Sequence, residues 1–216
     1  MEKNGGRPQR SAESRRRILE ATLEIAAERG FEGTTMAQVS ERSGLPIGSV
    51  YWHFENKDKL FAALLEYCVE AWEGSHRSWT FRPGETPAER LGQSIGVRAI
   101  EAAEPANFWR IGLLLALEQR LSGTAARETF LEIRRTRLTT MTEWWRLSLP
   151  EPVLDRDPGL PLRLAQYAMA MSDGMFISGS ANDGWDLAAL GEMLARSLNQ
   201  MAEAAIADAS REPSGS

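Results

Sequence analysis

The residues best suited to chemistry lie close together between Ile47 and Phe54, in the segment Ile-Gly-Ser-Val-Tyr-Trp-His-Phe. On a helix, Val50 and Phe54 are one turn apart and are expected to face a core, which leaves most of the other side chains outward. Several large exposed aromatic groups on one short helix are costly without a partner. The residues expected to face outward are Ile47, Ser49, Tyr51, Trp52 and His53.

These side chains suit contact with a nucleic acid. Tyr51 offers a hydroxyl and His53 a ring N–H to phosphates, Ile47 can touch a thymine methyl, and Ser49 can hydrogen-bond to base edges. Gly48 would let the backbone of this helix come close to DNA. Periodicity alone leaves open the alternative that the aromatic side chains only pack a small core.

Local signals place this segment in a pair of short helices. Thr35-x-x-Gln38 has the form of a capping box that starts the first helix. Gly44 ends that helix, and Pro46 suits the first turn of the second. Two short helices joined by a glycine turn form the helix-turn-helix pattern, whose second helix enters the major groove of DNA. Asn56 is expected to cap a long helix that reaches to about Trp79.

A first helix is expected to precede this pair, with Ser11 as its N-cap and Gly30 just past its end. Its buried stripe is Ile18, Ala21, Ile25 and Ala26. Residues 1–10 are rich in glycine, proline and arginine and are expected to form a disordered basic arm.

Charge is distributed unevenly along the chain, whose net charge is −5. Residues 1–60 hold ten Lys/Arg and nine Asp/Glu (+1), and the remaining residues hold fifteen and twenty-one (−6). Residues 1–19 alone carry six basic and two acidic side chains (+4). This asymmetry favours a polyanion partner for the N-terminal end, although a solvated basic tail explains it equally well.

Residues 11–60 resemble the DNA-binding domain of the tetracycline-repressor (TetR) family. The motif reads Gly30-Phe31-x-x-Thr34-Thr35-Met36-x-x-Val39-Ser40-x-x-Ser43-Gly44-Leu45-x-x-Gly48-x-x-Tyr51-x-His53-Phe54-x-x-Lys57-x-x-Leu60. The resemblance implies an all-α homodimer, a nearly palindromic double-stranded operator and release of DNA under control of a small-molecule effector. Pro46 departs from the pattern, because the family usually has a serine or threonine there.

The resemblance also implies roles for single residues. Thr35, Tyr51, His53 and Lys57 should contact the DNA backbone. Ile47, Gly48, Ser49 and Trp52 should lie nearest the bases. Arg15, Arg16 and Arg17 are further candidates for the backbone, and solvation explains them nearly as well.

The rest of the chain predicts a helical bundle. Helices are expected from Thr86 to before Pro105, from Ala106 to Leu121, from Thr124 to Leu149, and over 162–180 and 187–209, with a loop over 150–161. The expected organisation is a disordered arm (1–10), a helix-turn-helix domain (11–56), a ligand-binding and dimerisation domain (57–210) and a mobile tail (211–216).

An effector pocket is expected inside this bundle, since family pockets lie there, although ordinary core packing is the more frequent role of such residues. Trp144 and Trp145 are informative because adjacent helical residues are not expected to face one core. The candidate lining residues are Trp72, Phe108, Trp109, Leu113, Leu117, Met141, Trp144, Trp145, Tyr167, Met169 and Phe176.

The last two helices carry apolar stripes that could pair with those of a second copy as a four-helix interface. The alternative is packing within one chain. The candidate interface residues are Leu164, Ala168, Met171, Met175, Leu187, Leu190, Leu194, Leu198 and Met201.

Other classes of protein find little support. Glu73-x-x-His76 is half of a di-metal site whose second half is missing, and no catalytic fingerprint or cofactor motif appears. The apolar run 113–117 is far shorter than the ~20 residues that span a bilayer. No secretory signal is evident, and one cysteine forms no internal disulfide, so we expect a cytoplasmic protein that is not an enzyme and needs no cofactor, metal or membrane. The remaining alternative is a helical module that binds ligands or proteins without reading an operator.

Overall fold

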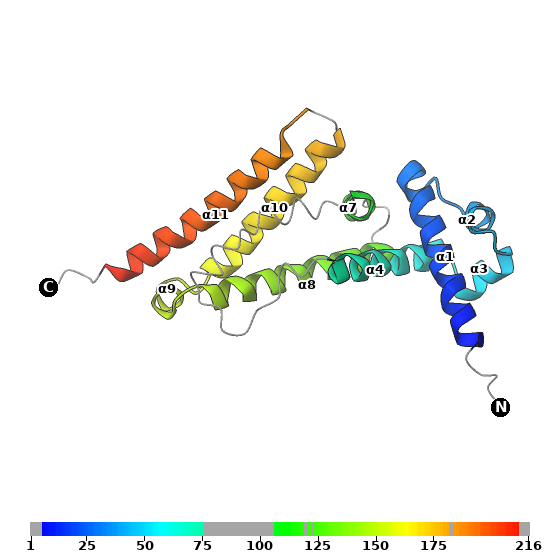
Figure 1. Ribbon diagram of the computed structural model, residues 1–216, viewed down its shortest axis with the longest axis horizontal. Coiled ribbons are helices and arrows are strands. Elements are labelled where there is room, and N and C mark those ends of the chain that lie inside the picture. The colour runs from blue at the N-terminus through cyan, green and yellow to red at the C-terminus, as the bar shows by residue number, and fades with distance from the viewer. Residues whose placement is uncertain (1–5, 76–105, 119–120, 122, 182–183, 212–216) are drawn as a thin grey trace. The chain divides into compact units, whose positions relative to one another are not determined.

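The computed structural model describes residues 6–75, 106–118, 121, 123–181 and 184–211 (Figure 1). The described residues contain helices and no strands, which confirms the all-α prediction. The helices predicted between Thr86 and Pro105, and the end predicted near Trp79, lie outside the described residues. The chain divides into two compact units, one of residues 1–74 and 105–133, the other of residues 75–104 and 134–216.

Unit 1 is built on three N-terminal helices, α1 (Gly6–Arg29), α2 (Met36–Ser43) and α3 (Ile47–His53). Figure 1 shows α2 and α3 as two short helices beside α1. Helices α4 (Lys57–Ser75) and α7 (Ala106–Leu117) and the start of α8 (Ala125–Ser148) supply the remaining described parts of this unit. The stripe of α1 is buried as predicted, with Ile18 fully enclosed.

Close helix packing in unit 1 requires a glycine at one point. A Cβ built on Gly112 of α7 would lie 2.0 Å from the ring of Phe130 on α8. Phe130 is itself fully buried in the core that α1, α3 and α4 share. The missing side chain therefore lets α7 approach α8 closely.

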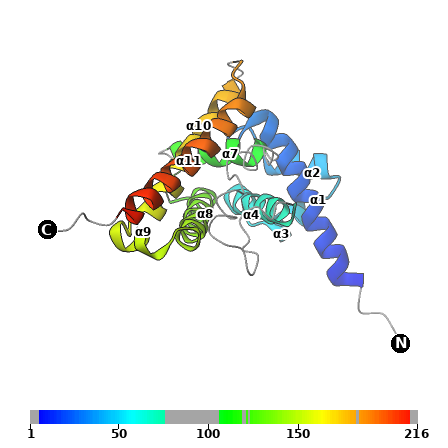
Figure 2. The same ribbon diagram turned by 60° about the vertical axis from the view of Figure 1, so that its left-hand side comes forward.

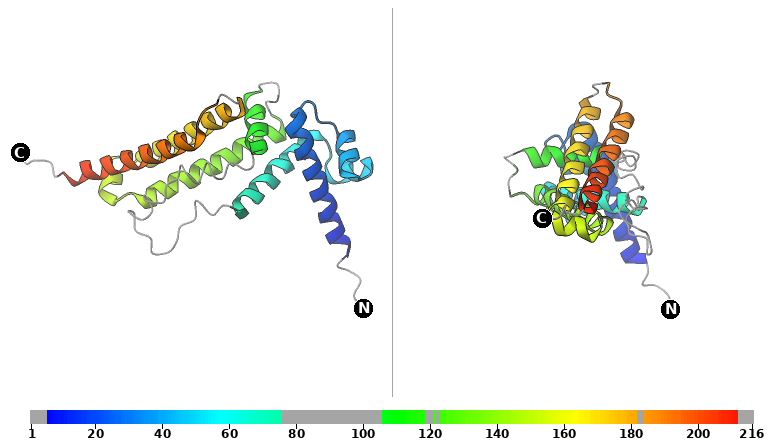
Figure 3. Two further views of the ribbon diagram at one scale, coloured as in Figure 1. Left: turned by 45° about the horizontal axis from the view of Figure 1, so that its top comes forward. Right: turned by 90° about the vertical axis from the view of Figure 1, so that its left-hand side faces the viewer.

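Unit 2 contains the rest of α8, the short α9 (Glu151–Arg156), α10 (Leu160–Ala181) and α11 (Leu187–Ser210). Figure 2 shows α10 and α11 side by side, and Figure 3 shows α9 near the C-terminal end of α11. Arg156 donates to the carbonyl oxygen of Asp208 at 2.7 Å and so joins α9 to α11.

Two local predictions were wrong. Helix α1 begins at Gly6, so Ser11 is not its N-cap and residues 6–10 are helical. The loop predicted over 150–161 contains α9, which Pro150 precedes and Pro152 opens. Proline fits the first turn of a helix because its missing N–H has no intrahelical acceptor there.

Candidate functional site

The start of α2 has the predicted capping box. The Thr35 hydroxyl accepts from the backbone N–H of Gln38 at 3.3 Å, and the Gln38 side chain accepts from the Thr35 N–H at 2.9 Å. The same hydroxyl lies 3.0 Å from the Gln38 side-chain oxygen. Thr35 is exposed, yet its hydroxyl is already engaged in the cap, so a contact with phosphate would compete with that bond.

The turn between α2 and α3 depends on Gly44, which ends α2 at φ +66 and ψ 23, in the left-handed region. Arg17 of α1 donates to the carbonyl oxygen of Ser43 at 2.5 Å, next to this turn. Pro46 lies just before α3 as its N-cap residue and makes no side-chain capping bond. The turn is therefore fixed by backbone conformation and by a contact from α1.

Helix α3 presents its aromatic side chains to solvent. Val50 is fully buried and Phe54 is 5 % exposed, whereas Tyr51 is 52 % and Trp52 73 % exposed. Ile47 is also exposed, and Ser49 and His53 are partly so. The alternative in which Tyr51 and Trp52 pack the core is thereby excluded for the isolated chain.

Gly48 has no structural reason to be a glycine. It is exposed, its φ is not positive, and a Cβ built there would meet no atom within 4 Å. Glycine inside a helix costs about 0.5–1 kcal/mol relative to alanine. Close approach by a partner at this point would account for that cost.

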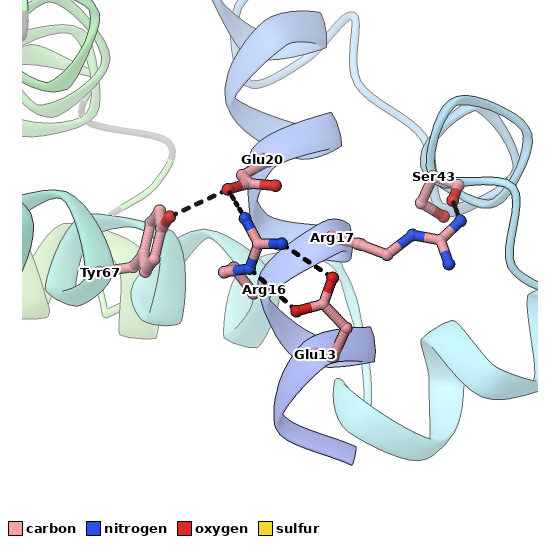
Figure 4. A network of polar contacts seen from close by, with 6 residues as sticks. All are labelled: Glu13, Arg16, Arg17, Glu20, Ser43 and Tyr67. Carbon is pink, nitrogen blue, oxygen red and sulfur yellow. Dashed lines mark hydrogen bonds and ion pairs between the residues drawn. The ribbon is translucent and has the colours of Figure 1, made fainter. Parts of the chain in front are cut away.

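Two of the three candidate arginines, Arg16 and Arg17, make hydrogen bonds within the protein (Figure 4). Arg16 bridges Glu13 at 2.8 Å and Glu20 at 2.6 Å, and Glu20 also lies 3.4 Å from the Tyr67 hydroxyl of α4. Arg17 is engaged at Ser43.

Arg15 instead lies over the ring of Phe54, 5.5 Å from its centre, beside the end of α3. Burial, and then the charge of Arg15, lower the pKa of His53 below its usual value. Arg15 thus contacts the aromatic end of α3, and sequence spacing could not single it out from its neighbours.

Asn56 caps α4 as predicted, accepting from the N–H of Lys59 at 2.9 Å. Lys57, predicted to bind phosphate, donates to the carbonyl oxygen of Phe31 at 3.1 Å and lies 4.4 Å from the centre of the Phe31 ring. Its nitrogen is 3.9 Å from Glu32. Lys57 therefore joins the α1–α2 turn to α4, a role that the sequence analysis missed because the partners are 26 residues apart.

The predicted pocket residues divide between the two units. Trp109 and Leu113 are half-buried in the core of unit 1 and Leu117 is exposed, while the side chains of Trp72 and Phe108 lie outside the described residues. Tyr167, Met169 and Phe176 are half-buried on α10 in unit 2. A single pocket formed by all the predicted residues is therefore not assembled within either unit.

Trp144 and Trp145 correct a sequence argument. Both are buried in one cluster with Met141, and their rings meet edge to face at 5.0 Å between centres. Adjacent helical residues thus do share a core here. The indole N–H of Trp145 is buried without a hydrogen-bond acceptor in the described part of the chain.

A charged cluster lies on the same helix. Arg134 binds Asp173 of α10 through two hydrogen bonds of 2.9 and 2.6 Å. Arg137 lies one turn further along α8. Burial lowers its pKa to about 10, although the negative charge of Asp173 acts to raise it.

Most of the predicted interface residues belong to the core of unit 2. Those buried within the chain are Leu164, Ala168, Met175, Leu194 and Leu198. Their burial favours the alternative of packing within one chain, because helical periodicity marks a buried stripe without saying what buries it. Leu187 and Leu190 are half-buried. Met171 and Met201 are exposed, as are Met193, Ile177, Leu162 and Trp185, which the prediction omitted.

The described residues contain neither a candidate metal site nor a membrane-spanning helix. No three His, Cys, Asp or Glu side chains gather there as a metal site, Cys68 is buried, and His76 lies outside those residues. No helix in the described ranges is long and apolar enough to cross a membrane.

The short capped helix, the glycine turn and the exposed second helix define a helix-turn-helix protein. Residues 18–64 match the family model described as bacterial regulatory proteins, tetR family. The transcriptional regulator TtgR of Pseudomonas putida is 43 % identical over 54 residues, which are 25 % of this chain and 26 % of that protein. The repressor KstR of Mycolicibacterium smegmatis is 35 % identical over 84 residues, 39 % of this chain and 41 % of that one.

Solved structures extend the likeness to the whole fold. A putative TetR-family regulator from Rhodococcus has a TM-score of 0.66 at 20 % identity, over 88 % of this chain and 98 % of that one. FadR of Bacillus subtilis, solved with stearoyl-CoA, has a TM-score of 0.62 at 23 % identity, over 85 % and 96 %. The chain spans about a quarter of the length of the first curated relatives it matches. Residues 18–64 therefore match the N-terminal region of the tetR family, and the rest of the chain shares a fold with the solved structures.

Proposed function

We propose that this chain is a cytoplasmic transcription regulator that binds operator DNA through α3. The exposed face of α3 carries the proposal: Ile47, Tyr51 and Trp52 are 43 %, 52 % and 73 % exposed on a helix whose opposite side is buried. Exposure of this size on one short helix favours a binding surface. The match of residues 18–64 to a family of regulatory proteins supports DNA as the partner.

In this proposal Tyr51, His53 and Arg15 hold phosphates at the end of α3, and Ile47 and Ser49 face the bases. Thr35 and Lys57 would contact the DNA backbone only by sharing or giving up their hydrogen bonds to Gln38 and Phe31. In this proposal Arg16 stabilises α1 through Glu13 and Glu20, and Arg17 stabilises the turn between α2 and α3.

The regulator is proposed to act as a homodimer on a nearly palindromic operator, with half-sites spaced in multiples of ~10 bp. The exposed apolar residues of α10 and α11, Met171, Met193 and Met201 among them, support this assembly. Large apolar side chains exposed to water are costly, and a two-fold partner packed over them would bury them.

A small, largely apolar effector is proposed to bind in unit 2 and to release the DNA, so that the protein acts as a repressor. The unsatisfied indole N–H of Trp145 supports an effector that carries an acceptor oxygen, because a buried donor without a partner costs about 1–3 kcal/mol. FadR of Bacillus subtilis, which has a similar fold, was solved with stearoyl-CoA, a ligand with an apolar acyl chain and a thioester oxygen that can accept a hydrogen bond.

Selection from a random-sequence duplex library, followed by a salt titration, tests the DNA proposal. We expect a two-fold symmetric motif and an affinity that falls steeply as salt rises, since phosphate contacts release counterions. Failure to enrich any motif, with affinity insensitive to salt, would favour a module that binds protein or ligand only.

A further inference from the structure

The carboxylate of Asp58 binds two backbone amides of a distant helix. Its Oδ2 accepts from the N–H of Ala125 at 2.8 Å, and its Oδ1 accepts from the N–H of Ala126 at 2.9 Å. These are the first two residues of α8, and Asp58 lies in the first turn of α4. All three residues belong to unit 1.

The start of α8 thus has two kinds of cap. The first N–H groups of a helix have no acceptor within it, and a negative charge near them is favourable. The next amide, that of Arg127, is bound from within the same segment by the Thr124 hydroxyl at 3.4 Å. The first two depend on α4 instead, so the position of α8 is tied to the first turn of α4.

Helix α8 also connects the two units. Its residues 125–133 belong to unit 1 and its residues 134–148 to unit 2, without a break in the helix. At 1.5 Å per residue it is about 36 Å long. Helix α4 remains in unit 1 as far as Gly74. The residues of α8 that bind Asp58 and those that belong to unit 2 are therefore parts of one continuous helix.

We propose that Asp58 is a positioning residue through which α8 controls the first turn of α4 and, with it, the DNA-binding surface. The inference rests on the proposed function. Lys57, the neighbour of Asp58, holds the turn that follows α1, and only three residues separate the end of α3 from the start of α4. Movement of α8 alters this junction, and DNA bound at the junction restrains α8, because coupling between two sites is reciprocal.

The variant Asp58→Asn removes the negative charge that binds the N–H groups of Ala125 and Ala126, and so weakens the link between α4 and α8. Thr124→Ala is the matched control, because it removes a capping bond at the same end of α8 without affecting α4. Both are compared with wild type for affinity to the selected duplex, at a temperature where urea unfolding shows each protein to be folded. We expect Thr124→Ala to bind within about 2-fold of wild type and Asp58→Asn to bind at least about 5-fold more weakly.

Amide hydrogen exchange at Ala125 and Ala126 supplies a second readout. We expect the duplex to slow exchange there in wild type and in Thr124→Ala, and to have much less effect in Asp58→Asn. Unchanged affinity in Asp58→Asn, or an equal loss in both variants, would overturn the inference while leaving DNA binding intact. If Asp58→Asn does not fold, the wild-type protein alone still tests the inference. Amide exchange at Ala125 and Ala126 that is equally fast with and without the duplex would overturn the inference. A wild type that selects no duplex overturns the proposed function as well.

Discussion

The ammonium group of Lys57 donates to the carbonyl oxygen of Phe31 at 3.1 Å and lies 4.4 Å from the centre of the same residue's ring. This contact joins the first turn of α4 to the turn after α1, so the lysine stabilises the domain that presents α3. A loss of DNA binding on substitution of Lys57 would therefore combine a folding effect with any effect on phosphate.

Lys57→Ala should lower the free energy of unfolding by about 1–2 kcal/mol, because a hydrogen bond to a charged, part-buried group and a cation–π contact are both lost. Urea unfolding measures this, with Lys59→Ala, an exposed neighbour on α4, as the control. Unchanged stability in Lys57→Ala would mean that the Phe31 contact contributes nothing and that the ammonium is available to phosphate.

Gly48→Ala should make the protein more stable but weaken its binding to DNA. Alanine fits the open space around Gly48 and should raise the free energy of unfolding by about 0.5–1 kcal/mol. The added methyl group should nevertheless weaken binding of the selected duplex, since it lies where the backbone of α3 would come close to DNA. Tighter binding by the more stable variant would show that Gly48 has no part in the interface.

His53 should make both stability and DNA binding depend on pH. Its pKa is lowered in the folded protein, by burial first and by Arg15 second. The unfolded chain therefore takes up the proton more readily, so His53 reduces stability as pH falls through its usual pKa of about 6.5. A phosphate at the ring would favour the charged form, so affinity for DNA should rise as pH falls.

Titration of the duplex between pH 8 and 5.5 checks this expectation, with His53→Gln as the control that lacks the titrating group. The wild-type protein should gain affinity relative to His53→Gln as the pH is lowered. The same pH dependence in both proteins would assign the effect to another group.

Assembly should depend on exposed methionines rather than on the leucines between them. Met193→Asp combined with Met201→Asp should yield folded monomers, because both side chains are exposed in the single chain. Leu194→Asp should instead unfold unit 2, because Leu194 is 3 % exposed in its core. Sedimentation and circular dichroism distinguish the two outcomes, and a dimeric double variant would place the interface elsewhere.

Local signals in the sequence predicted the helix-turn-helix well. The Thr35–Gln38 capping box, the left-handed Gly44 and the Asn56 cap each depend on residues within a few positions. The exposure of Tyr51 and Trp52 followed from the positions of Val50 and Phe54 on the same helix. Such features are predictable because one helical turn determines them.

Contacts between distant residues were not predictable in this way. The partners of Lys57 and Asp58 are 26 and 67 residues away, so no spacing rule marks them. The stripe containing Leu194 and Leu198 was correctly recognised as apolar, but burial within the chain and burial against a partner give the same periodicity. Helix α9 was missed because its prolines were interpreted as a loop, although Pro152 fits a first turn.

The central claim is that α3 reads base sequence, and repeating the duplex selection with Ser49→Ala tests it most directly. Ser49 is partly exposed on the DNA-facing side proposed for α3, and its removal should leave the fold intact. We expect a motif with the same half-site spacing in which the preference at one base pair of each half-site is lost or changed. A selected motif identical to that of wild type at every position, for Ser49→Ala and for Ile47→Ala alike, would contradict it.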